Sequence, residues 1–140
     1  MLYSSVRKVF GFSMLLLAIV SSSQSLAQSA QNSQQECYQF PVYNSFKQNE
    51  SALLSWYDVF RRAPSGSWEE RNALDQIRGI RASISAILQD SYGLMALSSN
   101  CVEAWGNDTF AEFQRASSGS PVEATYLESS RRIYSVGPAV

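Results

Sequence analysis

The stretch LSSNCVEAW, residues 97–105, carries Cys101, one of only two cysteines in this 140-residue chain. The other is Cys37, so a bond between them would close a loop of about 64 residues and restrict the unfolded chain strongly. The chain contains no histidine and no CxxC motif, and two isolated cysteines do not make a zinc site. We therefore predict a structural disulfide between Cys37 and Cys101. A free reactive thiol or an intermolecular bridge is the alternative.

The N-terminal residues indicate export. An apolar run over residues 9–20 follows Arg7 and Lys8, and it is shorter than the roughly 20 residues that a membrane-spanning helix needs. Ser-Leu-Ala at residues 25–27 fits the cleavage site of signal peptidase. We predict that residues 1–27 are a signal peptide of bacterial type, with an uncleaved N-terminal anchor as the alternative. The mature protein would be periplasmic or secreted, with no stable membrane span, in a compartment where cysteines pair.

Composition limits the partners. The net charge is −1 for the whole chain and about −3 after residues 1–27 are removed, because that segment holds two cations and no anion. A mildly acidic domain does not suit nucleic acid, which requires a basic face. No motif calls for a cofactor or a metal, and we predict neither.

The beginning of the mature chain differs from the rest. Residues 28–35 are polar without a period, and Pro41 favours an extended backbone before it. We therefore predict a flexible leader and extended segment over residues 28–43, followed by a single helical domain over residues 44–140.

Apolar residues in that domain recur at helical spacing. The first helix is expected over residues 44–63. Capping boxes at Ser67 and Ser120, each with a glutamate three residues later, predict helices that run to about Gly93 and to the residue before Gly137. Two short helices are expected between them, over residues 94–105 and 109–116. The fold class is all-α, a small disulfide-linked helical bundle of four to five helices.

Two short segments suggest a possible enzyme. NES at residues 49–51 and YGLMALSSN at residues 92–100 resemble the Glu-Ser and Gly-Leu-Met-Gln signatures of lytic transglycosylases. That resemblance implies that Glu50 is the general acid of a cell-wall glycan-cleaving enzyme. The chain departs from the family at Ala96, which stands in the place of the glutamine, and no apolar helix precedes the glutamate.

A simpler interpretation makes Glu50 a solvated residue in the first turn of a helix, with Leu94 and Met95 in the core. Without histidine the Ser-His-Asp triad is impossible, and the chain lacks GxSxG and glycine-rich phosphate-loop motifs. We therefore predict that the protein is not an enzyme.

Trp68 is the first candidate for protein binding, because an exposed tryptophan beside arginine is typical of the residues that dominate interfaces. It opens a helix after a turn, and Arg62 and Arg71 are expected nearby. Arg78 shares a helix face with Arg71. The alternatives are that Trp68 closes the core against Trp56 and that the arginines only form solvated ion pairs.

These observations predict a non-enzymatic exported protein that binds another envelope or secreted protein. It could be an envelope chaperone, an immunity or inhibitor protein, or an accessory of a secretion system. The architecture is similar to that of small disulfide-linked acid-stress chaperones and periplasmic immunity proteins, a similarity of shape that does not give function. A carrier of a small apolar ligand is the other alternative, and a pocket lined by leucine and isoleucine would favour it.

Overall fold

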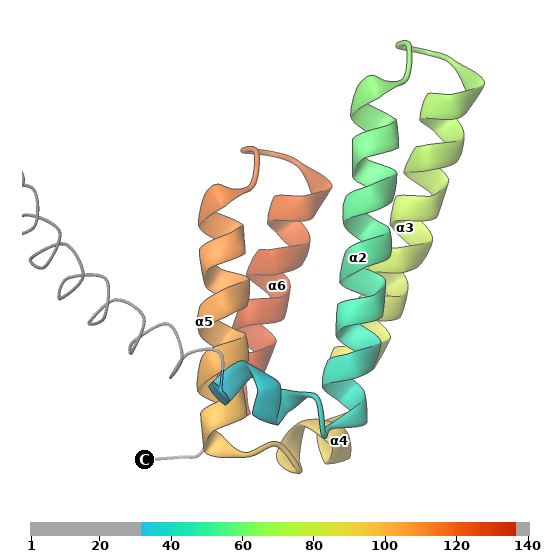
Figure 1. Ribbon diagram of the computed structural model, residues 1–140. Coiled ribbons are helices and arrows are strands. Elements are labelled where there is room, and N and C mark those ends of the chain that lie inside the picture. Colours follow the sequence, from blue (N-terminus) through green and yellow to red (C-terminus); the bar gives the residue numbers. More distant parts are fainter. Residues whose placement is uncertain (1–31, 137–140) are drawn as a thin grey trace, which may run out of the picture. The chain divides into compact units, whose positions relative to one another are not determined.

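The protein was analysed as a computed structural model that describes residues 32–136, and every regular element in this part of the chain is helical. Two antiparallel helix hairpins lie side by side, and a short helix lies in the connection between them (Figure 1). The helices are α2 (Pro41–Arg62), α3 (Trp68–Leu88), α4 (Ser91–Met95), α5 (Ser99–Arg115) and α6 (Pro121–Ser135). The predicted all-α bundle is confirmed. The predicted signal peptide, residues 1–27, lies outside the described residues.

The chain becomes helical earlier than the sequence predicts. Residues 32–37 are helical, and Pro41 is the first residue of α2, so the extended segment predicted before residue 44 is wrong. Proline suits this position because its missing N–H would have no partner there. The side-chain amide of Asn44 donates to the carbonyl oxygen of Tyr38 at 2.7 Å and closes the turn before the helix.

The two predicted serine caps are confirmed. The Oγ atoms of Ser67 and Ser120 each accept a 3.1 Å hydrogen bond from the backbone N–H of the glutamate three residues later. Each glutamate in turn accepts from the N–H of the glycine before the cap, at 3.1 Å in the first turn and 3.0 Å in the second. Both glycines have positive φ, 78° at Gly66 and 77° at Gly119, a conformation that other residues adopt only with strain.

The region between the hairpins differs from the prediction. Asp90 caps α4, ending the preceding helix before Gly93, and Ser98 caps α5 by accepting from the N–H of Cys101 at 3.2 Å. The two short helices predicted over residues 94–105 and 109–116 are wrong, because α5 continues through Gly106. A Cβ added at Gly106 would lie 2.6 Å from a ring carbon of Tyr134, so this glycine allows α5 and α6 to pack closely rather than ending a helix.

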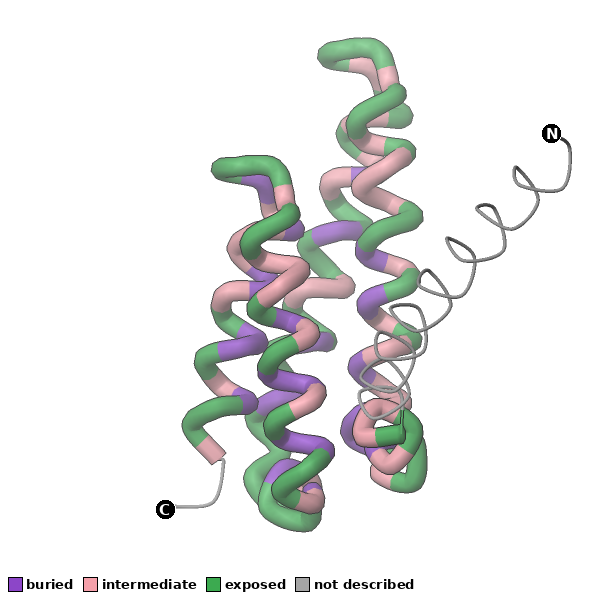
Figure 2. The backbone as a smooth tube through the Cα atoms, turned by 60° about the vertical axis from the view of Figure 1, so that its left-hand side comes forward, coloured by how far each residue is buried: buried purple, intermediate pink, exposed green. Residues whose placement is uncertain are grey.

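Aromatic side chains fill the core between the hairpins. The Trp105 ring on α5 meets Tyr43 and Phe46 on α2 edge to face, with centroid distances of 5.2 and 5.1 Å. Figure 2 shows the buried residues on the inner sides of the helices, while the turn at the tip of each hairpin is exposed. Burial of these large rings supplies much of the favourable free energy of folding.

The predicted disulfide between Cys37 and Cys101 is present, and both residues are fully buried. It joins the segment before α2 to the first turn of α5, with the two Cα atoms 5.0 Å apart. A disulfide is compatible with an oxidising compartment outside the cytoplasm. Within residues 32–136, the structure contains no helix that combines the length and the apolar character needed to cross a bilayer.

Candidate functional site

The tip of the α2–α3 hairpin, residues 58–71, projects beyond the tip of the α5–α6 hairpin (Figure 1). The cause is helix length. At 1.5 Å per residue the 22 residues of α2 are about 33 Å long, whereas the 17 residues of α5 are about 25 Å long. We call residues 58–71 the hairpin tip.

The turn in the hairpin tip is held by several local hydrogen bonds. The Ser67 N–H donates to the carbonyl oxygen of Pro64 at 3.0 Å, and the Glu70 carboxylate accepts from Gly66 at 3.1 Å. Arg71 donates to the carbonyl oxygen of Gly66 at 3.4 Å. A turn fixed in this way loses little conformational entropy on binding, which favours recognition.

Trp68 lies on this turn with 65% of its surface exposed. It is the first residue of α3, and the core cluster and the hydrophobic residues packed against it do not include it. The alternative in which Trp68 closes the core against Trp56 is therefore wrong, and Trp56 packs against the core without it. Its role in binding remains a prediction.

The structure places the predicted arginines at two levels of the hairpin. Arg62 lines a shallow pocket of about 460 Å³ at the tip, together with Val59 and Pro64, and its Nε lies 3.2 Å from Asp58. Arg71 is bound to the turn. Arg78 lies two helical turns further along α3, roughly 10 Å from Arg71 along the axis, and pairs with Asp75 at 3.5 Å. Trp68, Arg62 and Arg71 therefore all belong to the hairpin tip, whereas Arg78 does not.

A second exposed apolar site, on α4, was missed by the sequence interpretation. Tyr92 is 89% exposed and Met95 is 75% exposed, so the prediction that Met95 lies in the core is wrong. Leu94 between them is buried, as predicted. A helix of only five residues at the surface can bury one face at most, and the sequence interpretation missed this because it placed Met95 in a longer helix.

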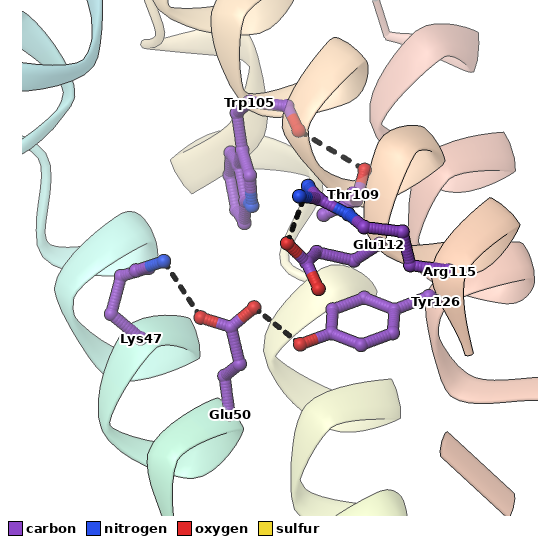
Figure 3. A network of polar contacts seen from close by, with 7 residues as sticks. All are labelled: Lys47, Glu50, Trp105, Thr109, Glu112, Arg115 and Tyr126. Carbon is purple, nitrogen blue, oxygen red and sulfur yellow. Dashed lines mark hydrogen bonds and ion pairs between the residues drawn. The ribbon is translucent and has the colours of Figure 1, made fainter. Parts of the chain in front are cut away.

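Glu50 is not the solvated first-turn residue that the sequence predicted. It is the tenth residue of α2, because the helix begins at Pro41, and only 8% of its surface is exposed. Its Oε1 lies 2.7 Å from the Nζ of Lys47, and its Oε2 accepts a 2.8 Å hydrogen bond from the hydroxyl of Tyr126 on α6 (Figure 3). Both carboxylate oxygens are thus engaged by side chains of the protein itself.

The pKa values of Tyr126 and Lys47 both shift in the direction that preserves their contacts with Glu50. Burial raises the pKa of the Tyr126 hydroxyl, and the charge of Glu50 raises it further, so the hydroxyl remains a donor. Burial alone would lower the pKa of Lys47, but its hydrogen bond to Glu50 and the charge of that group outweigh burial and raise the pKa. The cluster joins α2 to α6, and each oxygen of the Glu50 carboxylate contacts a side chain of the protein.

Within residues 32–136, the structure contains no group of three or more acidic, cysteine or histidine side chains that could hold a metal ion. Comparison with known proteins found no matching family model, no similar curated protein and no similar solved structure.

Proposed function

We propose that this protein is exported to the periplasm or the medium and acts there, without catalysis, by binding another envelope or secreted protein through the hairpin tip. The observation that carries the proposal is the largely exposed Trp68 on a projecting turn, in a hairpin tip that also contains Arg62 and Arg71. Tryptophan and arginine are the residues that most often dominate binding energy at interfaces. The role of the protein would be that of an envelope chaperone, an immunity or inhibitor protein, or an accessory of a secretion system.

Two features support the compartment. The disulfide between Cys37 and Cys101 suits an oxidising environment, and residues 1–27 have the order of charge, apolar run and small residues that signal peptidase recognises. Export with cleavage gives a periplasmic or culture-medium species that begins at Gln28. Intact mass measurement of the protein from those fractions tests this, and a full-length membrane-bound species would contradict it.

The contacts of Glu50 argue against the glycan-cleaving alternative. The general acid of such an enzyme must reach the glycosidic oxygen of a bound substrate to deliver its proton. Glu50 is mostly buried, and both of its oxygens are held by Lys47 and Tyr126. Binding through the hairpin tip requires no such access.

The decisive experiment captures the partner and then measures its affinity for matched variants. Immobilised mature protein is exposed to envelope extract, the captured protein is purified, and its Kd is measured by calorimetry. Trp68→Ala is expected to weaken binding by about 30-fold, the equivalent of about 2 kcal/mol. Tyr92→Ala is the control, because Tyr92 is also a highly exposed aromatic residue but lies on α4. Equal affinity of Trp68→Ala and wild type would refute the proposed surface.

A further inference from the structure

A second pocket lies between α3 and α6, away from the hairpin tip. Its volume is about 250 Å³, and its lining includes Arg81, Ile84 and Leu88 from α3 with Ser129 and Arg132 from α6. Ile84 and Leu88 are almost fully buried, with 3% and 4% of their surface exposed. The pocket therefore combines apolar walls with two guanidinium groups.

Small side chains account for the space. Ser85 on α3 and Thr125 and Ser129 on α6 line the pocket where larger residues would fill it. The hydroxyls of Thr125 and Ser129 donate to backbone carbonyl oxygens of their own helix, at 2.7 Å each. Their oxygens face a ligand only as acceptors, so the charged donors for an anion come from the arginines, and Ser85 and Gln89 also line the pocket.

The guanidinium of Arg81 has a donor without a hydrogen-bond partner among the described residues. Its Nε is buried and has no hydrogen-bond partner in the part of the chain that the structure describes. Its Nη2 lies 3.5 Å from the carboxylate of Glu128, whose side chain is 68% exposed. Such an exposed and long ion pair contributes little to stability, so a ligand carboxylate can replace Glu128 at small cost.

Arg132 is partly committed to the protein. Its Nε donates to the carbonyl oxygen of Leu88 at 2.7 Å, and its Nη2 donates to Ser91 at 3.3 Å. A guanidinium has five N–H donors, and the described residues offer no acceptor for the others. The hydrogen bond of its Nε holds the Arg132 guanidinium at the pocket, where its remaining N–H donors can bind a ligand.

The charges of the pocket define the class of ligand. Arg81 and Arg132 against Glu128 leave one net positive charge, which suits a monoanion. Planar guanidinium groups bind carboxylates in bidentate fashion, and the apolar walls suit an alkyl chain. A volume of 250 Å³ equals roughly eight water molecules at about 30 Å³ each, about the size of hexanoate.

We propose that the α3–α6 pocket binds a small organic carboxylate with a short alkyl chain, the carboxylate at Arg81 and Arg132 and the chain against Ile84 and Leu88. The proposal does not depend on the hairpin tip, since no pocket residue named here belongs to residues 58–71. It gives the protein a second capacity, the carriage or sensing of a short-chain carboxylate.

The test is an NMR titration of the ¹⁵N-labelled mature protein with sodium hexanoate, with hexanol and inorganic phosphate as separate probes. Saturable shifts are expected for the amides of Ile84, Leu88, Thr125 and Ser129. Hexanol and phosphate should each bind about 10-fold more weakly, since hexanol lacks the charge and phosphate lacks the alkyl chain. Hexanol binding as tightly as hexanoate would refute the role of the arginines, and phosphate binding as tightly would refute the role of the apolar walls.

Two variants separate ligand binding from folding. Arg81→Gln should weaken hexanoate binding about 10-fold, whereas Arg78→Gln, the same change at an exposed position that does not line the pocket, should leave it unchanged. Ser85→Phe fills the pocket from an exposed position and should abolish binding while both arginines remain. Equal affinities for Arg81→Gln and Arg78→Gln, or full binding by a folded Ser85→Phe, would overturn the proposal.

Discussion

The hydroxyl of Tyr126 on α6 donates a 2.8 Å hydrogen bond to the carboxylate of Glu50 on α2, across 76 positions of sequence. This buried bond joins the two hairpins inside the bundle, where water cannot easily take the place of either partner. An uncompensated buried carboxylate is costly, so the pair and Lys47 beside it fix the arrangement of the hairpins.

Tyr126→Phe removes only the hydroxyl and leaves Oε2 of Glu50 without its donor. We expect a loss of about 1–3 kcal/mol in the free energy of unfolding, measured by urea denaturation. Tyr134→Phe is the matched control, since its hydroxyl also bonds a side chain, Asn107 at 2.6 Å, but at an exposed site. A Tyr126→Phe protein as stable as Tyr134→Phe would show that the buried bond contributes nothing.

Glu50→Gln removes the charge that pairs with Lys47 and keeps the shape of the side chain. We expect reduced stability, by about 1–3 kcal/mol, and unchanged affinity for the partner once the amount of folded protein is matched. Calorimetric unfolding and partner binding check the two parts. Loss of biological function by a fully folded Glu50→Gln protein would restore the glycan-cleaving alternative.

Replacing both Cys37 and Cys101 with alanine removes the disulfide without adding a buried hydroxyl. The bond closes a loop of 64 positions, so the unfolded chain gains freedom worth about 4 kcal/mol in the chain-entropy model. Urea denaturation of the variant against the oxidised wild type measures the difference. Identical curves, or two thiols titrated in the unfolded wild type without reductant, would contradict the bond.

Trp68→Ala tests the surface position of the residue through stability alone. Because Trp68 is mostly exposed, the melting temperature should fall by little, with a change in unfolding free energy of about 0.5 kcal/mol or less. A core tryptophan would cost about 3 kcal/mol or more. Trp105→Ala, at a fully buried tryptophan, provides that reference in the same protein.

Asp108 gives a prediction for pH. Burial raises its pKa above the ordinary 3.8, against the opposing effect of Lys47, so the folded protein binds the proton more tightly than the unfolded chain does. This group therefore favours folding at low pH, and its contribution is lost as pH rises from about 3.8 through the higher folded pKa. Asp108→Asn should remove that dependence and raise stability at pH 7. Parallel curves of unfolding free energy against pH for the two proteins would contradict it.

Local patterns predicted much of the fold. Ser67 and Ser120 could be identified from the sequence as helix starts, because a cap needs only a serine and the backbone N–H of the residue three positions later. Gly106 misled the interpretation, since a glycine that ends a helix and one that admits a neighbouring ring look alike in sequence. Only the Tyr134 ring from α6 distinguishes them.

The candidate sites also differ in whether they depend on local sequence or on contacts between distant helices. Trp68 was found because a turn and a helix start are local features. The contact between Glu50 and Tyr126 and the α3–α6 pocket were not, because each depends on how α6 docks against a helix far away in sequence. Residue spacing within one helix carries no information about such pairs.

The complete burial of Cys37 and Cys101 has a consequence for how the disulfide forms and how it is lost. Thiol exchange requires that an attacking thiolate reach a sulfur atom, and neither cysteine is accessible in the folded state. The bond must therefore form before the segment that carries Cys37 has packed against α5. After that, small reductants can break it only when this contact opens, so the rate of this opening sets how long the oxidised protein lasts.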